Sequence, residues 1–562
     1  MSHHAAPFSV RAALRAVFAE PLPARPTLSQ RRAFHEYFVT HLPSSSLAPD
    51  RQHANHHRLP RNESSPHSGP SSRAAQLQQH PAHSRDTTVV RIPIKSAKHH
   101  FGAGVSRGSR PYNEDTYQAG TIEMPAFAKR QPVSLTRKLP GQEGNERGGQ
   151  VAKGESGDPQ VFYFGVFDGH GGAECSEFLR DRLHGYVEEA ALLFGMESSM
   201  HVDSGANASS LDSEGGVMGM QDGADLQKSL VSTWRETVGG YFKRFKPEYF
   251  PAVANHNSAA PPTTLNNSSI ETVLSYAFLK ADLDFTTAQA SKRTDAAREQ
   301  SAMEDPVLAD RPLNNDDVLF HPDRPASQNL RSWSRKGSSP DLAAPIGGTN
   351  RFKGGSTASV ALISTPTPVP FWHPASASTL IAAHVGDTRI LLSRTSDGKA
   401  IPLTTNHHPD APVEANRLRR YAATFVTDSF GEERMGGLAN TRAFGDIESK
   451  RIGVSAEPQI TRLDLQAAEY SFVVMISDGV SGHLSDQEIV DVVKEARTPA
   501  QGASDLVGFA VEVAEAADNA TALVVRLGGW ERRNEGGRGS MGTKEQREYR
   551  TQEAMDPRAR RQ

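Results

Sequence analysis

The stretch that decides the fold is residues 161–174, which read VFYFGVFDGHGGAE. Its first seven residues are mostly aromatic or β-branched, which is typical of a strand buried on both faces. We predict that this strand stops at Asp168, where glycines follow, and that a helix begins at Ala173. A carboxylate in that position is held at a rigid edge. The glycines behind it allow a backbone carbonyl to approach whatever the carboxylate binds.

The same stretch also has an ordinary interpretation, because Asp and Gly are common in turns between a strand and a helix. His170 makes a plain turn less attractive, since it places a proton donor beside a possible metal ligand. The rest of the chain is needed to decide between a turn and a functional site.

Length and composition exclude several classes of protein. The chain has 562 residues, more than one compact core usually needs, and its long polar stretches suggest one large domain with disordered additions. A net charge of −3 does not indicate nucleic-acid binding. The single cysteine, Cys175, excludes a disulfide framework and a cysteine-based zinc site. No apolar run reaches the roughly 18 residues of a membrane helix, so we expect no stable membrane insertion.

Residues 1–88 have the composition of a leader segment. Residues 1–80 contain no lysine and only four acidic residues, whereas Arg, Ser and Pro abound. Residues 8–18 can form a short amphipathic helix that carries Arg11 and Arg15. These features are typical of a mitochondrial transit peptide. The alternative is a disordered tail on a cytoplasmic protein.

We expect one folded domain over residues 89–528 and a disordered tail over residues 529–562. Three stretches inside the domain lose periodicity and are rich in polar residues, Gly or Pro. We interpret them as insertions, and they cover about residues 125–158, 197–225 and 288–347. The last of these is too long for an ordinary loop.

Strands and helices are predicted in separate groups. Helical spacing of apolar residues occurs over about residues 178–190, 230–245, 270–281, 486–496 and 504–517. Strand patterns occupy residues 357–364, 379–385, 389–393, 471–477 and 521–527. Strands in a run, with helices grouped apart from them, predict an α+β fold with antiparallel sheets rather than alternating βαβ units.

Acidic residues recur at the ends of the predicted core segments, often next to glycine. They are Glu114, Asp115, Asp168, Asp387, Asp478 and Asp518. Each could be an ordinary turn residue, but so many in one domain would be an unusual distribution of turns. Carboxylates gathered at one sheet edge repel each other unless a cation lies between them. Oxygen ligands with no cysteine and few histidines nearby favour Mg²⁺ or Mn²⁺ over zinc. The pattern therefore predicts a centre for two hard metal ions.

Short motifs carry these residues in a fixed order along the chain. They are Arg110-Pro-Tyr-Asn-Glu114-Asp115, Phe167-Asp168-Gly-His170-Gly-Gly172, Gly355-Ser-Thr-Ala358, Val385-Gly-Asp387-Thr-Arg389, Leu438-Ala-Asn-Thr-Arg-Ala-Phe-Gly-Asp446, Ser477-Asp478-Gly479 and Asp518-Asn519. In this order the motifs resemble those of the PPM-type (type 2C) metal-dependent Ser/Thr protein phosphatases. The resemblance spans about residues 89–527, and the ordered set is far more specific than any one motif. The leader, the insertions and the variant motif ending at Asp446 most resemble fungal mitochondrial members.

The resemblance implies a four-layer αββα sandwich, in which helices flank two packed antiparallel sheets and the metal site lies at one end. It also implies hydrolysis of phosphoserine and phosphothreonine in phosphoprotein substrates. Two Mg²⁺ or Mn²⁺ ions would activate a water molecule for direct attack on phosphorus, so no covalent phosphoenzyme is expected.

The motifs also imply metal ligands. Asp168 is expected to bridge two ions, and the Gly169 carbonyl to bind one of them. Asp478 and Asp518 are expected to complete the protein ligands of the first ion.

The remaining site residues are implied in the same way. Glu114 is expected to serve the second ion, directly or through water, with Asp115 supporting the bound waters. Asp387 matches a third, weaker metal position. Arg110 is expected to hold the substrate phosphate through its guanidinium fork. His170 is expected to be the general acid that protonates the departing alkoxide, and the alternative is a histidine that merely orients ligands.

Two other functions stay open on the sequence. The first is a catalytically weak regulatory or binding protein with the PPM fold. Such a protein should have lost ligands, whereas this chain keeps Asp168, Asp478 and Asp518. The second is another dinuclear hydrolase, such as a nuclease. That function would require a basic groove bearing aromatic residues, and the core sequence offers no obvious equivalent.

Overall fold

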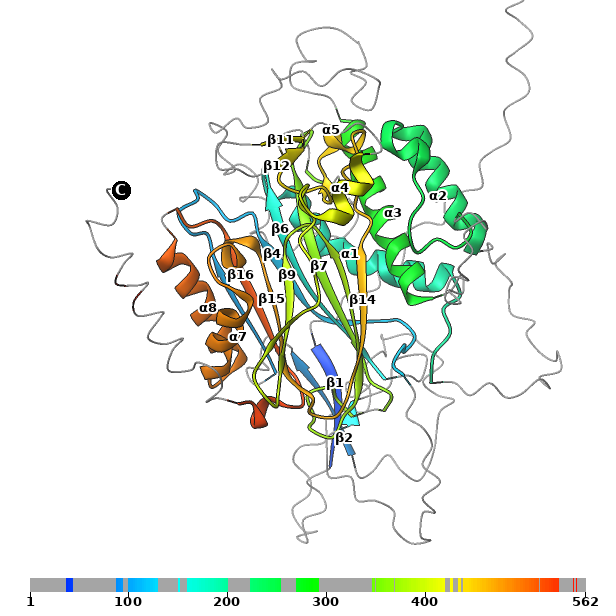
Figure 1. Cartoon of the computed structure of the whole chain (residues 1–562). Coiled ribbons are helices and arrows are strands. Elements are labelled where there is room, and N and C mark those ends of the chain that lie inside the picture. Colours follow the sequence, from blue (N-terminus) through cyan, green and yellow to red (C-terminus); the bar gives the residue numbers. More distant parts are fainter. Residues whose placement is uncertain are drawn as a thin grey trace, which may run out of the picture. The chain divides into compact units, whose positions relative to one another are not determined.

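The computed structural model of the chain describes residues 100–129, 159–200, 223–253, 269–292, 346–419, 438–514 and 516–534, apart from residues 349 and 368, together with the short segments 37–43, 87–93, 150–151, 425–427 and 433–435 and the single residues 549 and 552. Within this part of the chain, two large antiparallel sheets pack face to face, and helices cover their outer faces (Figure 1).

The larger sheet has the strand order β14-β8-β7-β6-β4, with β13 paired to β7. Its strands are β4 (Thr116–Ile122), β6 (Val161–His170), β7 (Gly355–Ser364), β8 (Ser378–Val385), β13 (Phe444–Gly445) and β14 (Gln459–Leu465). All of its neighbouring strands run antiparallel. β7 and β8 are buried along their whole length, because protein covers both faces of the sheet.

The smaller sheet has the strand order β10-β9-β15-β16-β3. Its strands are β3 (Phe101–Ser106), β9 (Arg389–Arg394), β10 (Ala400–Pro402), β15 (Tyr470–Ile476) and β16 (Ala520–Arg526). β3, from the beginning of the domain, pairs with β16 near its end, and Ser106 lies opposite Ala520. The loop that follows β3 therefore lies beside the residues that precede β16.

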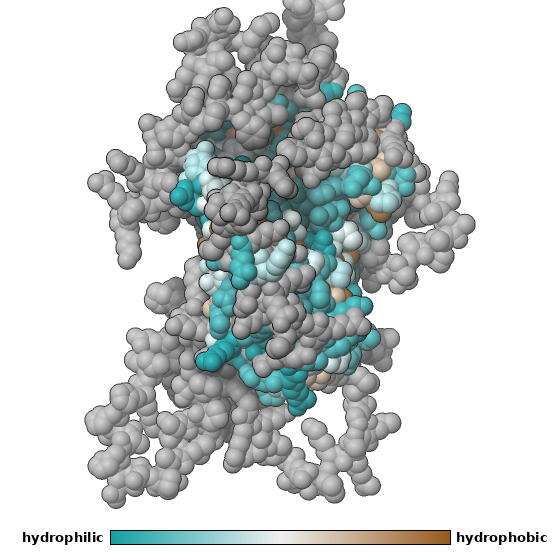
Figure 2. All heavy atoms as spheres, turned by 60° about the vertical axis from the view of Figure 1, so that its left-hand side comes forward, coloured by the Kyte–Doolittle hydropathy of each residue, from teal (hydrophilic) through white to brown (hydrophobic). Residues whose placement is uncertain are grey.

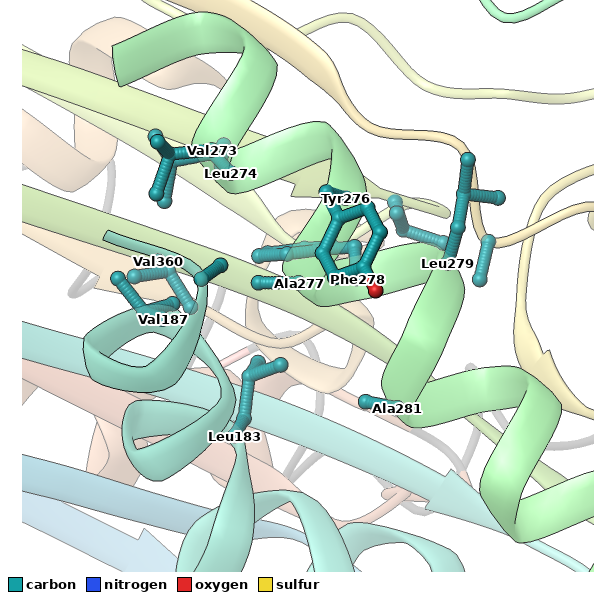
Figure 3. Close-up of a cluster of buried hydrophobic side chains, with 14 of the residues drawn as sticks. Leu183, Val187, Val273, Leu274, Tyr276, Ala277, Phe278, Leu279, Ala281 and Val360 are labelled. Atoms are coloured by element: carbon teal, nitrogen blue, oxygen red, sulfur yellow. The ribbon is translucent and has the colours of Figure 1, made fainter. Parts of the chain in front are cut away.

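Three helices lie on the outer side of the larger sheet. They are α1 (Glu174–Leu193), α2 (Gly223–Thr237) and α3 (Ile270–Ala290). Leu183 and Val187 of α1 pack with Ala277 and Phe278 of α3 and with Val360 of β7 (Figure 3). In α1 the apolar residues recur every three or four positions, so one stripe faces the sheet, whereas α3 is buried on nearly all sides. Each large side chain that is fully buried here stabilises the fold by about 1.5–3 kcal/mol.

Two helices cover the smaller sheet on the opposite side of the sandwich (Figure 1). They are α7 (Asp486–Glu495) and α8 (Pro499–Val513). Ser485 and Glu488 form a capping box that fixes the start of α7. Thr498 caps α8, and Pro499 occupies the first turn, where proline is favoured.

The core between the two sheets follows the alternation of the strands. In β6, Phe162, Phe164 and Val166 enter this core, whereas Tyr163 and Phe167 face the helices. Such alternation is expected because successive side chains of a strand point to opposite faces. The layers are therefore helix, sheet, sheet and helix, and the predicted α+β sandwich is confirmed.

β6 is longer than its predicted span of residues 161–167. Its ladder with β7 continues through Asp168, Gly169 and His170, which lie opposite Thr357, Ser356 and Gly355. The polar residues and glycines that suggested a turn are held in the strand by this pairing. The chain leaves the sheet only at Gly171, whose φ of 73° is readily adopted by glycine.

Shorter elements complete the described structure. They are β1 (Tyr37–Pro43), β2 (Thr87–Pro93), β5 (Gln150–Val151), η4 (Gly240–Arg244), α4 (Pro412–Arg419), β11 (Phe425–Thr427), β12 (Glu433–Met435), α5 (Ile447–Lys450), α6 (Asp478–Ser481) and η7 (Trp530–Arg532). β1 pairs with β2 and β5 in a separate three-stranded sheet.

The structure refines the expected leader and insertions at three places. Residues 37–43, which we expected to lack structure, form strand β1, since Tyr, Phe, Val and Thr favour strands. Phe127, inside the expected insertion 125–158, is buried in the core at 3 % exposure. α3 continues to Ala290, past the expected start of the long insertion. The predicted helix over residues 8–18 lies outside the described residues.

The described surface is largely hydrophilic, as Figure 2 shows for one face. Large apolar side chains are exposed at scattered positions of the described part, including Leu192 and Val413. None of the described helices combines the length and the apolar character that crossing a membrane requires.

Candidate metal centre

Three acidic side chains meet at one end of the sandwich. Asp168 lies near the end of β6, Asp387 follows β8, and Asp478 opens α6 directly after β15. One carboxylate oxygen of each residue lies within 4.8 Å of the others. The two sheets thus contribute to one cluster, because Asp168 and Asp387 come from the larger sheet and Asp478 from the smaller.

Strand register accounts for this convergence. Phe164 and Val166 of β6 face the smaller sheet, so Asp168, the next residue on that face, is directed between the sheets. β7 lies between β6 and β8 in the sheet, and its Ala358 pairs with Val385 at the end of β8. Asp387 follows two residues later and therefore lies at the same edge.

The protein environment disfavours full ionisation of this cluster. Burial raises the pKa of Asp168 well above its usual range, and the charge of Asp478 raises it further. Loss of solvent around the carboxyl group raises the pKa of Asp478 to about 7, with the charge of Asp387 as the next cause. A cation between the carboxylates would remove both the repulsion and the cost of desolvation.

Asp387 behaves differently from its two neighbours. Burial acts to raise its pKa, but hydrogen bonds from His408 and Asn440 lower it below the usual value. His408 Nε2 lies 3.5 Å from Asp387 Oδ2. Asp387 therefore remains charged more readily than Asp168 or Asp478.

Asp115 lies beside these three carboxylates. Ser477 Oγ donates a hydrogen bond of 2.8 Å to Asp115 Oδ2, whereas the buried Oδ1 has no hydrogen-bond partner. Burial raises the pKa of Asp115 to about 6. An unpartnered buried carboxylate oxygen is costly, and a metal ion or its water would satisfy it.

Glu114 is held against the end of β6 through its backbone. Ser176 Oγ donates to the Glu114 carbonyl oxygen at 2.5 Å. A side chain at Gly169 would place its Cβ only 2.6 Å from that same oxygen, so this close approach requires glycine. Burial raises the pKa of the Glu114 carboxyl group, which lies close to the backbone N–H of Gly172.

Arg110 and Asp518 form an ion pair at the mouth of the site. Arg110 Nη2 lies 2.7 Å from Asp518 Oδ2, and the two side chains are 60 % and 39 % exposed. An ion pair this exposed contributes at most about 1 kcal/mol, so either partner can exchange it for another ligand. Asp518 is thus oriented by Arg110 rather than by the three clustered carboxylates.

Asn519 holds the loop that carries Arg110 and Glu114. Its Oδ1 accepts a hydrogen bond of 2.7 Å from the Glu114 backbone N–H. Its Nδ2 donates to the carbonyl oxygens of Arg107 and Tyr112, each at 3.0 Å. The Asp518-Asn519 motif therefore supplies a structural residue as well as a candidate ligand.

His170 faces Asp446 rather than one of the clustered carboxylates. Its Nε2 lies 2.9 Å from both carboxylate oxygens of Asp446. Burial acts to lower the pKa of His170, but the carboxylate of Asp446 and then those of Asp387 and Glu114 raise it overall.

The donor set fits a hard divalent cation. Asp168, Asp387 and Asp478 offer only oxygen atoms, and Asp115, whose charge acts on Asp168 and Asp478, adds an unpartnered carboxylate oxygen nearby. Mg²⁺ and Mn²⁺ prefer such ligands.

Sequence reasoning assigned no role to Asp446, Asn519 or Asn440, which contact the predicted site residues. All three lie inside quoted motifs, where Asp446 follows a glycine and Asn519 follows a predicted ligand, and that was the available signal. Their contacts are not readable from spacing, because His170 and Asp446 are 276 residues apart in the chain.

Comparison with known proteins gives the family. A sequence profile described as "Protein phosphatase 2C" matches residues 322–519. The chain is 32 % identical over 450 residues to Protein phosphatase 2C homolog 4 of Schizosaccharomyces pombe. The aligned region covers 79 % of this chain and 84 % of that protein. It is 36 % identical over 152 residues to the mitochondrial Protein phosphatase 1K of Xenopus laevis, covering 27 % of this chain and 40 % of that protein.

Among solved structures, a serine-threonine phosphatase 2C from Toxoplasma gondii aligns with a TM-score of 0.39 and 16 % identity, over 76 % of this chain and 94 % of that one. The match to the Schizosaccharomyces pombe protein extends over most of both sequences, and it confirms the resemblance drawn from the motifs. The chain belongs to the protein phosphatase 2C family.

Proposed function

We propose that this chain hydrolyses phosphoserine and phosphothreonine in proteins, with two Mg²⁺ or Mn²⁺ ions bound at the end of the sandwich. The observation that carries the proposal is the meeting of Asp168, Asp387 and Asp478, whose oxygens lie within 4.8 Å of one another. Membership of the protein phosphatase 2C family supports metal-dependent dephosphorylation in general.

The proposed metal-binding residues are Asp168, the Gly169 carbonyl, Glu114, Asp115, Asp387, Asp478 and Asp518. Bound divalent ions would supply an activated water molecule and stabilise charge on the phosphate. We assign Asp387 to a third, weaker position. Arg110 contacts only Oδ2 of Asp518, and loosening of this exposed pair would make that oxygen available to a cation.

We assign the substrate phosphate to Arg110. Its guanidinium group can donate two parallel hydrogen bonds to phosphate oxygens, which stabilises the charge that spreads over them during the reaction. The exposed pair with Asp518 is weak enough for this exchange. Incoming phosphate would then free the Asp518 carboxylate for a cation at the same moment.

We assign protonation of the leaving group to His170. An alkoxide from serine or threonine is a poor leaving group, so a proton donor near neutral pH accelerates its departure. The His170 side chain is 33 % exposed and can reach a substrate at the mouth of the site.

The test is hydrolysis of a phosphothreonine peptide, p-nitrophenyl phosphate, bis(p-nitrophenyl) phosphate and DNA by the full chain. Each is measured with Mg²⁺, with Mn²⁺ and with excess chelator. We expect metal-dependent turnover of the two monoesters and none of the diesters. Diester cleavage would instead indicate a nuclease or phosphodiesterase. Metal binding without turnover of any substrate would indicate a regulatory protein.

We also propose import into mitochondria. Residues 1–80 are rich in arginine and poor in acidic residues, and one relative is named as mitochondrial. Fusing residues 1–60 to a fluorescent protein should direct it to mitochondria. A diffuse cytosolic signal would contradict this proposal and favour a cytoplasmic enzyme.

A further inference from the structure

Asp446 has a contact that an ordinary turn residue would not need. Its side chain is 5 % exposed, and both of its carboxylate oxygens lie 2.9 Å from Nε2 of His170. Because carboxylate oxygens accept hydrogen bonds, His170 donates its Nε2–H to Asp446. The other ring nitrogen, Nδ1, is then the one available for proton exchange.

The backbone at Asp446 is in a conformation that few non-glycine residues adopt, although aspartate tolerates it better than most. Its φ and ψ are 46° and 51°, in the left-handed region, and it follows Gly445 with a φ of 72°. Such a conformation costs a non-glycine residue on the order of 1 kcal/mol and persists only where the surroundings enforce it. A glycine here would relieve the strain, so the aspartate is present for its side chain.

A fully buried ion pair enforces this turn. Asp282 of α3 accepts a hydrogen bond of 2.9 Å from the Gly445 backbone N–H, and Lys450 Nζ lies 2.5 Å from the other Asp282 oxygen. Lys450 also donates to the Ala443 carbonyl oxygen at 2.7 Å. Both charged side chains are 0 % exposed. The turn that presents Asp446 is therefore tied to the centre of helix α3.

Two glycines at the start of β7 leave space around the His170–Asp446 pair. A Cβ at Gly355 would lie 2.4 Å from Asp446 Oδ2, and a Cβ at Gly354 would lie 2.1 Å from the His170 carbonyl oxygen. The Gly354 carbonyl oxygen also accepts the Asp446 backbone N–H at 2.9 Å. The start of β7 is thus shaped to let the carboxylate reach the imidazole.

From these contacts we propose that Asp446 is a positioning residue for His170. This role rests on the proposed function. The Asp446 carboxylate fixes the imidazole ring so that Nε2–H points toward the carboxylate and Nδ1 points toward the substrate. Hydroxide attacks phosphorus and the bond from phosphorus to the ester oxygen breaks. The departing alkoxide then takes the proton from Nδ1 of the imidazolium, which becomes neutral imidazole and still donates Nε2–H to Asp446.

The simpler explanation is that the pair only satisfies a buried carboxylate. That explanation predicts the same loss for every substrate, because disturbing the fold disturbs binding and chemistry alike. A positioning role predicts a loss that depends on the leaving group. Nitrophenolate departs without protonation, whereas the alkoxide of phosphothreonine needs a proton.

The experiment compares the full-length variants Asp446→Asn and Asp446→Gly, since both residues tolerate a positive φ. For a phosphothreonine peptide with saturating Mn²⁺, we expect kcat to fall roughly tenfold to a hundredfold with little change in KM. For p-nitrophenyl phosphate, we expect kcat to fall by less than about threefold. Asp446→Gly should lose more than Asp446→Asn, because an amide oxygen can still accept the Nε2–H.

Two controls make the outcome specific. Ala468→Gly removes a side chain from the other described non-glycine residue with a positive φ, at 56°, and should leave both substrates unaffected. His170→Gln should show the same dependence on the leaving group, and adding Asp446→Gly to it should cause no further loss.

Equal losses on both substrates, or no loss on either, in the Asp446 variants would overturn the proposal. If His170→Gln keeps its leaving-group dependence in that case, only the role of Asp446 fails. If the unmodified chain does not hydrolyse the phosphopeptide, the proposed function itself fails. Melting temperatures of all variants show whether a loss reflects unfolding.

Discussion

The molecule contains two groups of charged side chains that differ in how they are balanced. Around Glu414 of α4, the carboxylate is paired with two guanidinium groups: Arg417 Nη2 lies at 2.7 Å and Arg442 Nη2 at 2.6 Å. Thr441 Oγ1 adds a hydrogen bond of 2.7 Å. At the end of the sandwich, by contrast, Asp168 lies against other carboxylates.

The pKa shifts in the two groups have opposite signs. Burial acts to raise the pKa of Glu414, but the charges of Arg417 and Arg442 outweigh it and bring it well below the usual value. The pKa of Asp168 is raised by burial and by its neighbours together. A complete ion network is a structural feature, whereas carboxylates without a balancing charge favour binding of a proton or a cation. Four predictions test this contrast.

The largest effect is expected for Asp478→Asn. It removes a charge from the unbalanced cluster, so metal-dependent turnover of a phosphothreonine peptide should fall by more than about a hundredfold. The fold should be retained, because no charged partner is left unpaired. Activity assays with Mn²⁺, together with circular dichroism, check both parts. Activity near that of the unmodified chain would remove Asp478 from the ligand set.

Next comes Glu414→Gln, which should have the opposite profile. It leaves two buried guanidinium groups without their carboxylate, so the free energy of unfolding should fall by about 3–5 kcal/mol. Urea denaturation measures the change. Asp397→Asn is the matched control, because solvent screens the exposed Arg394–Asp397 pair and its loss should change the free energy of unfolding little. Similar small losses in both variants would contradict a structural role for the network.

A smaller effect is expected for Arg110→Ala. Losing the guanidinium group removes hydrogen bonds to the substrate phosphate, so KM for a phosphopeptide should rise roughly tenfold. Arg394→Ala serves as the control. Arg394 pairs with Asp397 and lies at the last residue of β9, whereas Asp387 of the candidate site lies just before the first residue of that strand. An unchanged KM in the Arg110 variant would argue against phosphate binding.

The smallest effect is a pH dependence of the metal-free protein. The pKa values of Asp115 and Asp478 are raised to about 6 and about 7, so the folded state holds these protons more tightly than the unfolded chain. Stability from these groups is present at low pH and is lost as pH rises through that range. The melting temperature should therefore fall by a few degrees between about pH 5 and pH 7.5.

Two comparisons isolate the cluster in this measurement. Saturating Mn²⁺ should weaken the pH dependence, because a cation compensates the ionised carboxylates. Asp478→Asn should weaken it as well and should raise the melting temperature of the metal-free protein at the upper pH. The same slope in the variant and the unmodified chain would place the titrating groups elsewhere.

Much of the fold could be predicted from local patterns. The strand predicted over residues 379–385 is found as Ser378–Val385, and the helix over residues 486–496 as Asp486–Glu495. These segments succeed because apolar periodicity and capping residues such as Ser485 act within a few positions of each other. The end of β6 was missed because pairing with β7 outweighs the turn tendency of Asp and Gly.

The candidate site was predictable only in part, for the same physical reason. Each carboxylate could be placed at the end of a core segment, and the antiparallel sheets bring Asp168, Asp387 and Asp478 together. The interactions that connect separate motifs were not predictable. The Arg110–Asp518 ion pair and the Asp446 contact of His170 depend on how distant loops pack, which periodicity does not encode.

The alternation along β6 has a consequence for how this chain can change. Deleting or inserting one residue between Val161 and Phe167 would turn Asp168 toward the helices and remove it from the other carboxylates. One apolar side chain in this strand can replace another at modest cost. In this strand, therefore, the number of residues is constrained more tightly than their identity, and a change in length that a surface loop would tolerate would here separate Asp168 from Asp387 and Asp478.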